Sequence, residues 1–167
     1  MSITPCLWFD TQGEEAAAFY TSVFPDSRIR AVSHYGEAGP RPAGMAMMVD
    51  FELNGRRFLA LNGGPEFTFN ESISFTIECA GQDEVDHYWD QLSEGGEEGP
   101  CGWLKDRYGV SWQVVPNRLT ELLADPDPGV AQRVMGAMLQ MRRIEIAALE
   151  AAAESGRPEA NRSGAGR

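Results

Sequence analysis

A pattern of residue types near the start of this chain returns 69 positions later. Its members are Glu14, Glu15, Ala16, Phe19, Tyr20 and Val23, which return as Asp83, Glu84, Val85, Tyr88, Trp89 and Leu92. A second set returns at a spacing of 54, with Gly55, Phe58, Ala60 and Leu61 matched by Gly109, Trp112, Val114 and Val115. The sequence thus indicates one strand, helix and strand-rich unit used twice. Two such units bury surface that one alone leaves exposed, and a seam between two units is a place where a small molecule fits.

Periodicity and turn signals predict the same order of elements in each half. Thr11 and Glu14 fit a capping box at the start of the first helix, and Asn54-Gly55 is a strong hairpin signal. The segment 36–44 has too much glycine and proline for regular structure and is a candidate lid. Strands are expected at 3–9, 27–35, 45–53, 56–62, 72–79, about 101–106 and about 110–115, with the second helix at about 82–93.

The character of the sequence changes after Pro116. Asp127 is a good helix N-cap, and Pro128 suits the first helical position. The apolar residues that follow predict one amphipathic helix to about residue 153, packed on its own domain or on a second subunit. We therefore expect a two-module domain over 1–118, with modules at about 1–64 and 70–117, then a helical extension over 119–154. Residues 155–167 lack an apolar anchor and are expected to be a disordered tail.

The formal net charge of −11 excludes several classes of partner. Binding a phosphate backbone needs a basic face, and an anionic membrane surface repels an acidic protein. The first residues do not resemble a signal peptide, and no window is long and apolar enough for a membrane span. These features predict a cytoplasmic protein that binds neither nucleic acid nor membrane.

The three cysteines, Cys6, Cys79 and Cys101, form no CxxC pair and are expected to be core or near-core thiols.

Several motifs, taken in order, resemble those of one superfamily. They are LWFD (7–10), EEAAAFY (14–20), VFPDSRI (23–29), FLALNGGPEF (58–67), SFTIEC (74–79), EVDHYW (84–89), CGWLKDRYGVSWQVVP (101–116) and DPDPGVAQRVMGAMLQM (125–141). They are similar to the PhnB-like branch of the vicinal oxygen chelate superfamily, often labelled 3-demethylubiquinone-9 3-methyltransferase and related to glyoxalase I and bleomycin-resistance proteins. The resemblance implies an α+β fold in which two βαβββ modules form a curved eight-stranded sheet around a cavity. It also implies a homodimer.

The resemblance further implies where a metal ion would bind. In metal-dependent members of the superfamily, the ligands are His, Glu or Gln on the first and last strands of each module. Matching the motifs puts these places at Pro5, Leu59, Ser74 and Gln113. Proline and leucine side chains have no donor atom, and serine and glutamine are weak neutral ligands. We therefore expect no metal centre, and the sequence indicates no other cofactor.

Strand alternation in the same register predicts a ligand pocket for a small organic molecule. Its polar side would be Ser74, Thr76, Glu78, Ser111 and Gln113, and its apolar side Leu7, Phe9, Leu59 and Leu61. Trp112 and Val114 would then pack under the helices. Glu78 and His34 are the candidate catalytic residues, because a carboxylate or an imidazole can transfer protons near neutral pH.

Four functional hypotheses remain open at this point. The first is a metal-free small-molecule-binding protein of the superfamily, or an enzyme with a metal-independent activity. The second is a methyltransferase, although S-adenosylmethionine usually binds at a glycine-rich turn of a doubly wound sheet, which this sequence lacks. The third is sequestration of a cationic, antibiotic-like ligand by an acidic protein. The fourth is a metal-dependent lyase or dioxygenase, which the missing ligands disfavour.

Overall fold

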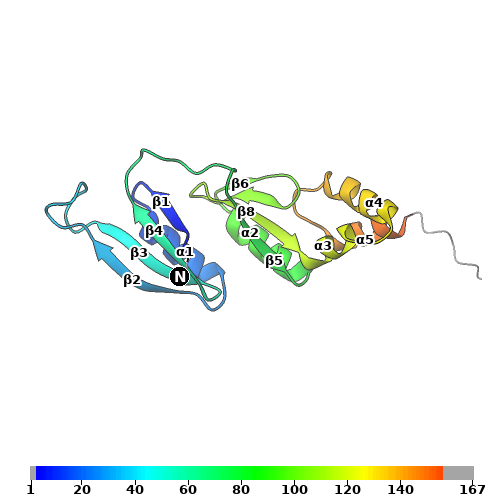
Figure 1. The fold of residues 1–167 in the computed structure, drawn as a ribbon, viewed down its shortest axis with the longest axis horizontal. Helices are drawn as coiled ribbons and strands as arrows, with labels where there is room; N and C mark the ends of the chain where they lie inside the picture. The colour runs from blue at the N-terminus through cyan, green and yellow to red at the C-terminus, as the bar shows by residue number, and fades with distance from the viewer. Residues whose placement is uncertain (1–2, 156–167) are drawn as a thin grey trace, which may run out of the picture. The chain divides into compact units, whose positions relative to one another are not determined.

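The computed structural model describes residues 3–155, which divide into two compact units. The first unit contains residues up to Ile73 together with the segment Asp106–Ser111. Its elements are β1 (Cys6–Phe9), α1 (Gly13–Val23), β2 (Arg28–His34), β3 (Ala46–Leu53) and β4 (Arg56–Asn62). The strands form one sheet in the order β1-β4-β3-β2, in which β1 runs parallel to β4 and the other neighbours are antiparallel (Figure 1).

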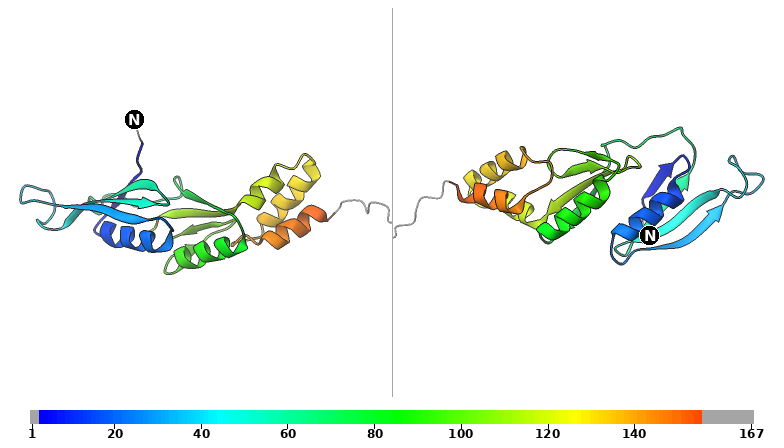
Figure 2. Two further views of the ribbon diagram at one scale, coloured as in Figure 1. Left: turned by 90° about the horizontal axis from the view of Figure 1, so that it is seen from below. Right: turned by 180° about the vertical axis from the view of Figure 1, so that it is seen from behind.

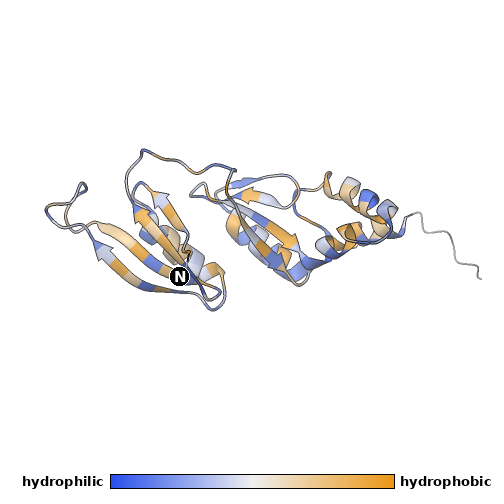
Figure 3. Cartoon of the chain, viewed as in Figure 1, coloured by the Kyte–Doolittle hydropathy of each residue, from blue (hydrophilic) through white to orange (hydrophobic). Residues whose placement is uncertain are grey.

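Helix α1 covers one face of this sheet and contacts all four strands (Figure 2). Its inward side chains, among them Ala16, Ala17 and Tyr20, are fully buried with Val49 and Phe51 of β3. Much of β3 and β4 alternates between buried and half-exposed residues, as a sheet covered on one face requires (Figure 3). The hairpin between β3 and β4 turns at Asn54 and Gly55, both with positive φ, which confirms the predicted tight turn.

The second unit repeats the pattern with shorter strands. The elements of this module are β5 (Phe75–Cys79), α2 (Gln82–Ser93), β6 (Glu97–Glu98), β7 (Trp103–Lys105) and β8 (Ser111–Pro116). The strand order β5-β8-β7-β6 matches that of the first sheet, with β5 parallel to β8. The two βαβββ modules and the α+β class are thus confirmed, with the eight strands in two four-stranded mixed sheets.

The predicted single helix over about 129–153 is wrong, because the extension contains three shorter helices. They are α3 (Asn117–Leu123), α4 (Pro128–Met138) and α5 (Ile146–Glu154). The start of α4 agrees with the sequence, since Asp127 caps Gly129 N and Pro128 follows. The chain leaves the helix after α4 because the carbonyls of Met141 and Arg142 accept hydrogen bonds from Cys101 N and Gly102 N, at 2.8 and 2.7 Å.

The three helices pack on one another around a small apolar core of their own. The fully or nearly fully buried members of this core are Leu119, Leu122, Val130, Val134, Ile144, Leu149 and Ala153. Arg133 of α4 donates to the carbonyl oxygens of Ala152 and Ala153, which stabilises the end of α5. The extension therefore buries much of its apolar side within its own chain, while Met135 and Leu139 are exposed. The predicted tail beyond Ser155 lies outside the described residues, and within 3–155 no helix has the length and apolar character of a membrane span.

Burial of Cys79 gives the second unit a measurable pH dependence. Cys79 is fully buried at the end of β5, and burial, with a smaller contribution from Glu84, raises the pKa of its thiol from about 9 to about 12. Because the pKa is higher in the folded chain, this contribution to stability is complete below pH 9 and is lost as the pH rises towards 12. We expect the free energy of unfolding to fall less steeply above pH 9 in Cys79→Ala than in the wild type. Cys101→Ala is the matched control, and an identical slope in all three proteins would contradict the assignment.

Candidate functional site

The polar residues predicted for the pocket lie on one face of the second sheet. In the ladder between β5 and β8, Thr76 is beside Gln113 and Glu78 is beside Val115. Gln113 Nε2 donates a hydrogen bond to Ser74 Oγ at 2.9 Å. Ser74 and Gln113 are half-buried, whereas Thr76 and Glu78 are exposed. This face can therefore offer hydrogen-bonding groups to a ligand.

The alternate residues of the same two strands form the opposite, apolar face. Trp112 is beside Phe75 in the ladder, with ring centroids 5.4 Å apart, and Val114 is beside Ile77. Cys79 on this face is close enough to Glu84 and Tyr88 of α2 to interact electrostatically with both. The face with Trp112 is thus the one that the helix covers, in agreement with the predicted alternation.

Ser111 begins β8 and points to the same side of the strand as Gln113, two residues later. Only 1% of Ser111 is exposed, and its Oγ has no hydrogen-bond partner within the described part of the chain. A buried hydroxyl without a partner is uncommon, because losing its hydrogen bonds to water is unfavourable. A ligand or a water molecule that reaches Ser111 would satisfy it.

In the first sheet, the side chains of β4 face the predicted sides, whereas those of β1 face the opposite sides. An added Cβ on Gly13 of α1 would lie 3.3 Å from Ala60, so Ala60 faces the helix and Leu59 and Leu61 face away from it. The β1–β4 ladder places Leu7 beside Ala60 and Phe9 beside Asn62. Leu7 and Phe9 are consequently buried on the helix side.

The expectation that Leu7 and Phe9 face away from the helix is therefore wrong. The residues of β1 on the outward face are Cys6, beside Leu59, and Trp8, beside Leu61. The error has a simple cause. Three residues separate β1 from α1, whereas only two separate β5 from α2, so the strands correspond at a spacing of 70 although the helices correspond at 69.

The same shift changes the first of the four places matched to metal ligands. Pro5 precedes β1, and Ser74 now corresponds to Thr4 rather than to Pro5. Leu59 and Gln113 still correspond to each other across the two ladders. Within residues 3–155, no group of three His, Cys, Asp or Glu side chains is close enough together to hold a metal ion.

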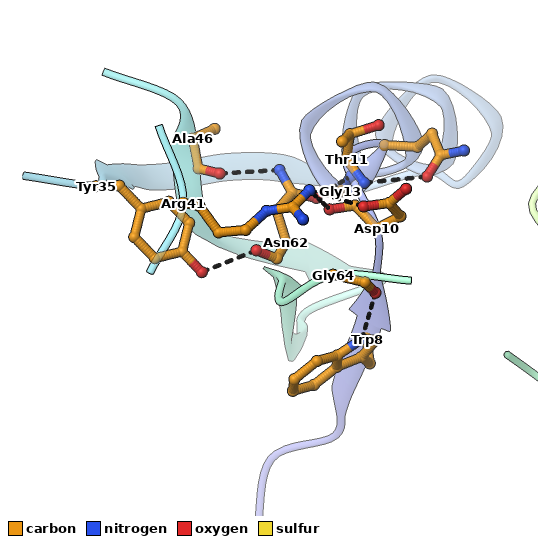
Figure 4. Close-up of polar contacts among 10 residues, drawn as sticks. Trp8, Asp10, Thr11, Gly13, Tyr35, Arg41, Ala46, Asn62 and Gly64 are labelled. Carbon is orange, nitrogen blue, oxygen red and sulfur yellow. Dashed lines mark hydrogen bonds and ion pairs between the residues drawn. The ribbon is translucent and has the colours of Figure 1, made fainter. Parts of the chain in front are cut away.

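A polar cluster that the sequence did not reveal lies at the carboxyl ends of β1 and β4 (Figure 4). Asn62 is only 1% exposed. Its Oδ1 accepts a hydrogen bond from Gly13 N at 2.7 Å, and its Nδ2 donates to Ala46 O at 2.9 Å. Its main-chain oxygen accepts one from the Tyr35 hydroxyl at 2.8 Å. The side chain of Asn62 thus connects α1 to β3, and its main-chain oxygen adds the residue after β2.

Asn62 also replaces the predicted capping box at the start of α1. The helix has no N-cap side chain bonded to its first turn, and Thr11 contributes only its main-chain N, which donates to Gln12 Oε1 at 3.2 Å. The glycine at position 13 permits the close approach, because a Cβ there would lie 2.7 Å from Asn62 Oδ1. A residue from the end of β4 therefore satisfies the first helix amide, which no local motif could indicate.

A second buried polar residue, Asp106, organises the turn between β7 and β8. It is 3% exposed, and its Oδ1 accepts hydrogen bonds from Tyr108 N and Val110 N at 2.8 and 3.1 Å. Its Oδ2 accepts one from the hydroxyl of Tyr20 in α1 at 2.7 Å. Burial raises the pKa of the Tyr20 hydroxyl well above its ordinary value, and the negative charge of Asp106 raises it further. The D-x-x-G pattern at 106–109 was the available signal, since aspartate often closes such turns.

The two candidate catalytic residues belong to different units. His34 is exposed at the end of β2 in the first unit, beside Ala46 in the ladder. Glu78 is exposed in β5 of the second unit. A catalytic role for either residue stays a prediction.

Paired βαβββ modules with this strand order are the architecture of the vicinal oxygen chelate superfamily. The sequence profile of the 3-demethylubiquinone-9 3-methyltransferase family matches residues 1–115, which is more than half of the chain. The chain therefore belongs to this family, the PhnB-like branch of the superfamily. The match ends within β8, so α3, α4 and α5 lie beyond it.

Two solved structures resemble the chain at the level of the fold. The PhnB protein from Bacillus cereus has 34% sequence identity and a TM-score of 0.63, over 70% of this chain and 99% of its own. Protein PA1353 from Pseudomonas aeruginosa has 21% identity and a TM-score of 0.58, over 70% of this chain and 97% of its own. A search of curated proteins finds no match.

Proposed function

We propose that the polar face of the second sheet binds a small organic molecule through Ser74, Thr76 and Gln113. The observation that carries this proposal is the buried Ser111 hydroxyl, which has no partner among the described residues and points to the same side of β8 as Gln113. The Gln113 amide adds a donor and an acceptor on a half-buried surface. A few such groups on a largely apolar scaffold are typical of small-molecule sites.

The remaining parts of this proposal come from the sequence and the family. We infer that binding requires no metal ion, because Leu59 has no donor atom and Ser74 and Gln113 are neutral. If the protein is an enzyme, its activity is then metal-independent. A cytoplasmic location and a homodimer stay predictions, the latter implied by the family resemblance.

The family description makes a methyltransferase the second candidate. S-adenosylmethionine usually binds where a glycine-rich turn enters a helix of a doubly wound parallel sheet. Here both sheets are mixed, and the single glycine at the start of α1 has its amide bonded to Asn62.

Sequestration of a cationic ligand remains a third candidate, since the net charge is −11 and Glu78 is exposed on the polar face. A metal-dependent lyase or dioxygenase is the least favoured candidate, because the positions matched to metal ligands carry no strong ligand.

Comparative capture tests the binding proposal. Immobilised wild-type protein is incubated with a metabolite extract of its own host, and the eluted molecules are identified by mass spectrometry. Gln113→Leu keeps a similar volume and removes the hydrogen-bonding groups, so we expect the captured molecule to bind about 10- to 100-fold more weakly. Gln91→Leu makes the same change at an exposed position of α2 and should capture normally. Equal capture by all three proteins, or none by the wild type, would contradict the proposal.

A further inference from the structure

The segment between β2 and β3 is tied down at its base. Tyr35 is buried and its hydroxyl donates to Asn62 O at 2.8 Å. Gly39 N donates to Gly36 O at 3.0 Å, and Gly44 N donates to Tyr35 O at 2.9 Å. These bonds give the candidate lid a defined loop conformation.

The far end of the loop is stiff. Arg41 stands between Pro40 and Pro42, and proline fixes its own φ and restricts the residue before it to an extended conformation. Gly39 and Gly44 lie on either side of this tip. Gly44 has a φ of +85, and no atom beyond its chain neighbours lies within 4 Å of where its Cβ would be. A stiff tip between two glycines can move as one body, because glycine accepts many backbone conformations.

The contact that holds the tip is only half complete. Arg41 Nη2 donates to the Asp10 carboxylate at 2.7 Å and to Asp10 O at 3.1 Å (Figure 4). Its Nε is buried and has no partner among the described residues. On β3 and β4 of the same sheet, Arg57 uses both Nε and Nη2 for the two oxygens of Asp50, each at 2.9 Å. The Arg41 contact thus gains one charged pair and leaves one donor buried without an acceptor, which is unfavourable.

We propose that residues 36–44 are a flap that Arg41 latches to Asp10 and that opens at its glycine ends. The closed flap is favoured by the ion pair and opposed by the buried Nε, so opening needs little free energy compared with unfolding the sheet. Opening frees the Arg41 guanidinium and the Asp10 carboxylate at the carboxyl end of β1 for other partners. The proposal does not depend on the ligand-binding face, which belongs to the second sheet.

Hydrogen–deuterium exchange of the full-length chain, resolved to single amides by NMR, tests the flap. In Asp10→Asn, we expect the amides of Gly39 and Gly44 to exchange at least about tenfold faster than in the wild type, because a hydrogen bond to a charged group is lost. Asp50→Asn is the matched control, since it makes the same change at the carboxylate that pairs with Arg57 on this sheet. It should leave the flap amides unchanged. The amides of β4 should keep their wild-type rates in both variants.

Raising the salt concentration from about 0.05 to 0.5 M should also accelerate exchange of the flap amides severalfold in the wild type, but not in Asp10→Asn. Unchanged flap exchange in Asp10→Asn would overturn the latch. An equal acceleration in the flap and in β4 would overturn the idea that the flap opens separately from the sheet.

Discussion

Replacing Trp112 with alanine should lower the free energy of unfolding by about 3–5 kcal/mol, as expected when a large core aromatic residue is truncated. Trp112 is 3% exposed, and its ring lies against Phe75 on the face of the second sheet that α2 covers. The loss comes from the apolar contacts of the indole ring and from the cavity that remains. Urea-induced unfolding measured at neutral pH gives the difference directly.

The neighbouring residue provides the control for this prediction. Gln113 is the next residue of β8 and lies on the opposite face, so Gln113→Leu should change stability by less than about 1 kcal/mol. The pair of variants separates a residue required for packing from one proposed to contact a ligand. A small loss in Trp112→Ala, or an equally large loss in Gln113→Leu, would show that the two faces of β8 have been assigned the wrong way round.

Asp106→Ala should be similarly damaging, with a loss of about 3–5 kcal/mol, because several buried donors lose their acceptor together. The Tyr20 hydroxyl and the amides of Tyr108 and Val110 all donate to the Asp106 carboxylate. Tyr20→Phe removes one of these bonds and should cost about 1–3 kcal/mol. Thermal and urea unfolding of each variant would measure both losses.

A second tyrosine–carboxylate bond serves as the control for Asp106. The hydroxyl of Tyr108 donates to Glu15 at 2.9 Å at an exposed position. Tyr108→Phe should therefore change stability by less than about 1 kcal/mol, since water replaces the lost bond. If Tyr108→Phe were as destabilising as Tyr20→Phe, the burial of the Tyr20–Asp106 bond would not explain its effect.

The sequence was most informative where local chemistry decides the structure. Asn54-Gly55 adopts the two positive φ angles of a tight hairpin, and β4 begins and ends at the expected residues. Asp127 and Pro128 begin α4 as local capping rules predict. The repeated pattern gave the order of elements in both modules, because each copy carries the same turns and apolar spacing.

Contacts between distant segments explain why the sequence predicted a single helix over about 129–153. The helix ends after α4 because Cys101 N and Gly102 N donate to the carbonyl oxygens of residues 141 and 142. The side chain of Gln82 adds two more bonds, since its Nε2 donates to Ile144 O and its Oε1 accepts from Ile146 N. No periodicity in 129–153 contains that information, and tertiary contacts override helix propensity. Strand β6 has only two residues, too few to give an alternating pattern.

The faces of the strands that carry the candidate site residues were predictable only in part. The face of β5 and β8 follows from alternation alone, which was correct within the second module. The face of β1 required the length of the loop before α1, and a difference of one residue moved Leu7 and Phe9 to the helix side. Asn62 could not be recognised, since Gly13 lies 49 positions away in the sequence. The turn pattern at 106–109 indicates a local role for Asp106, but not its bond to Tyr20, 86 positions away.

Native mass spectrometry of the wild-type protein, purified without denaturation from its own host, is the most direct test of the proposed function. We expect a noncovalent adduct with the mass of a small organic molecule other than S-adenosylmethionine, bound without a metal ion. Gentle activation should release it and leave the mass of the bare chain. A bare chain from the outset, an adduct of S-adenosylmethionine, or one tightly bound metal ion per chain would contradict the account.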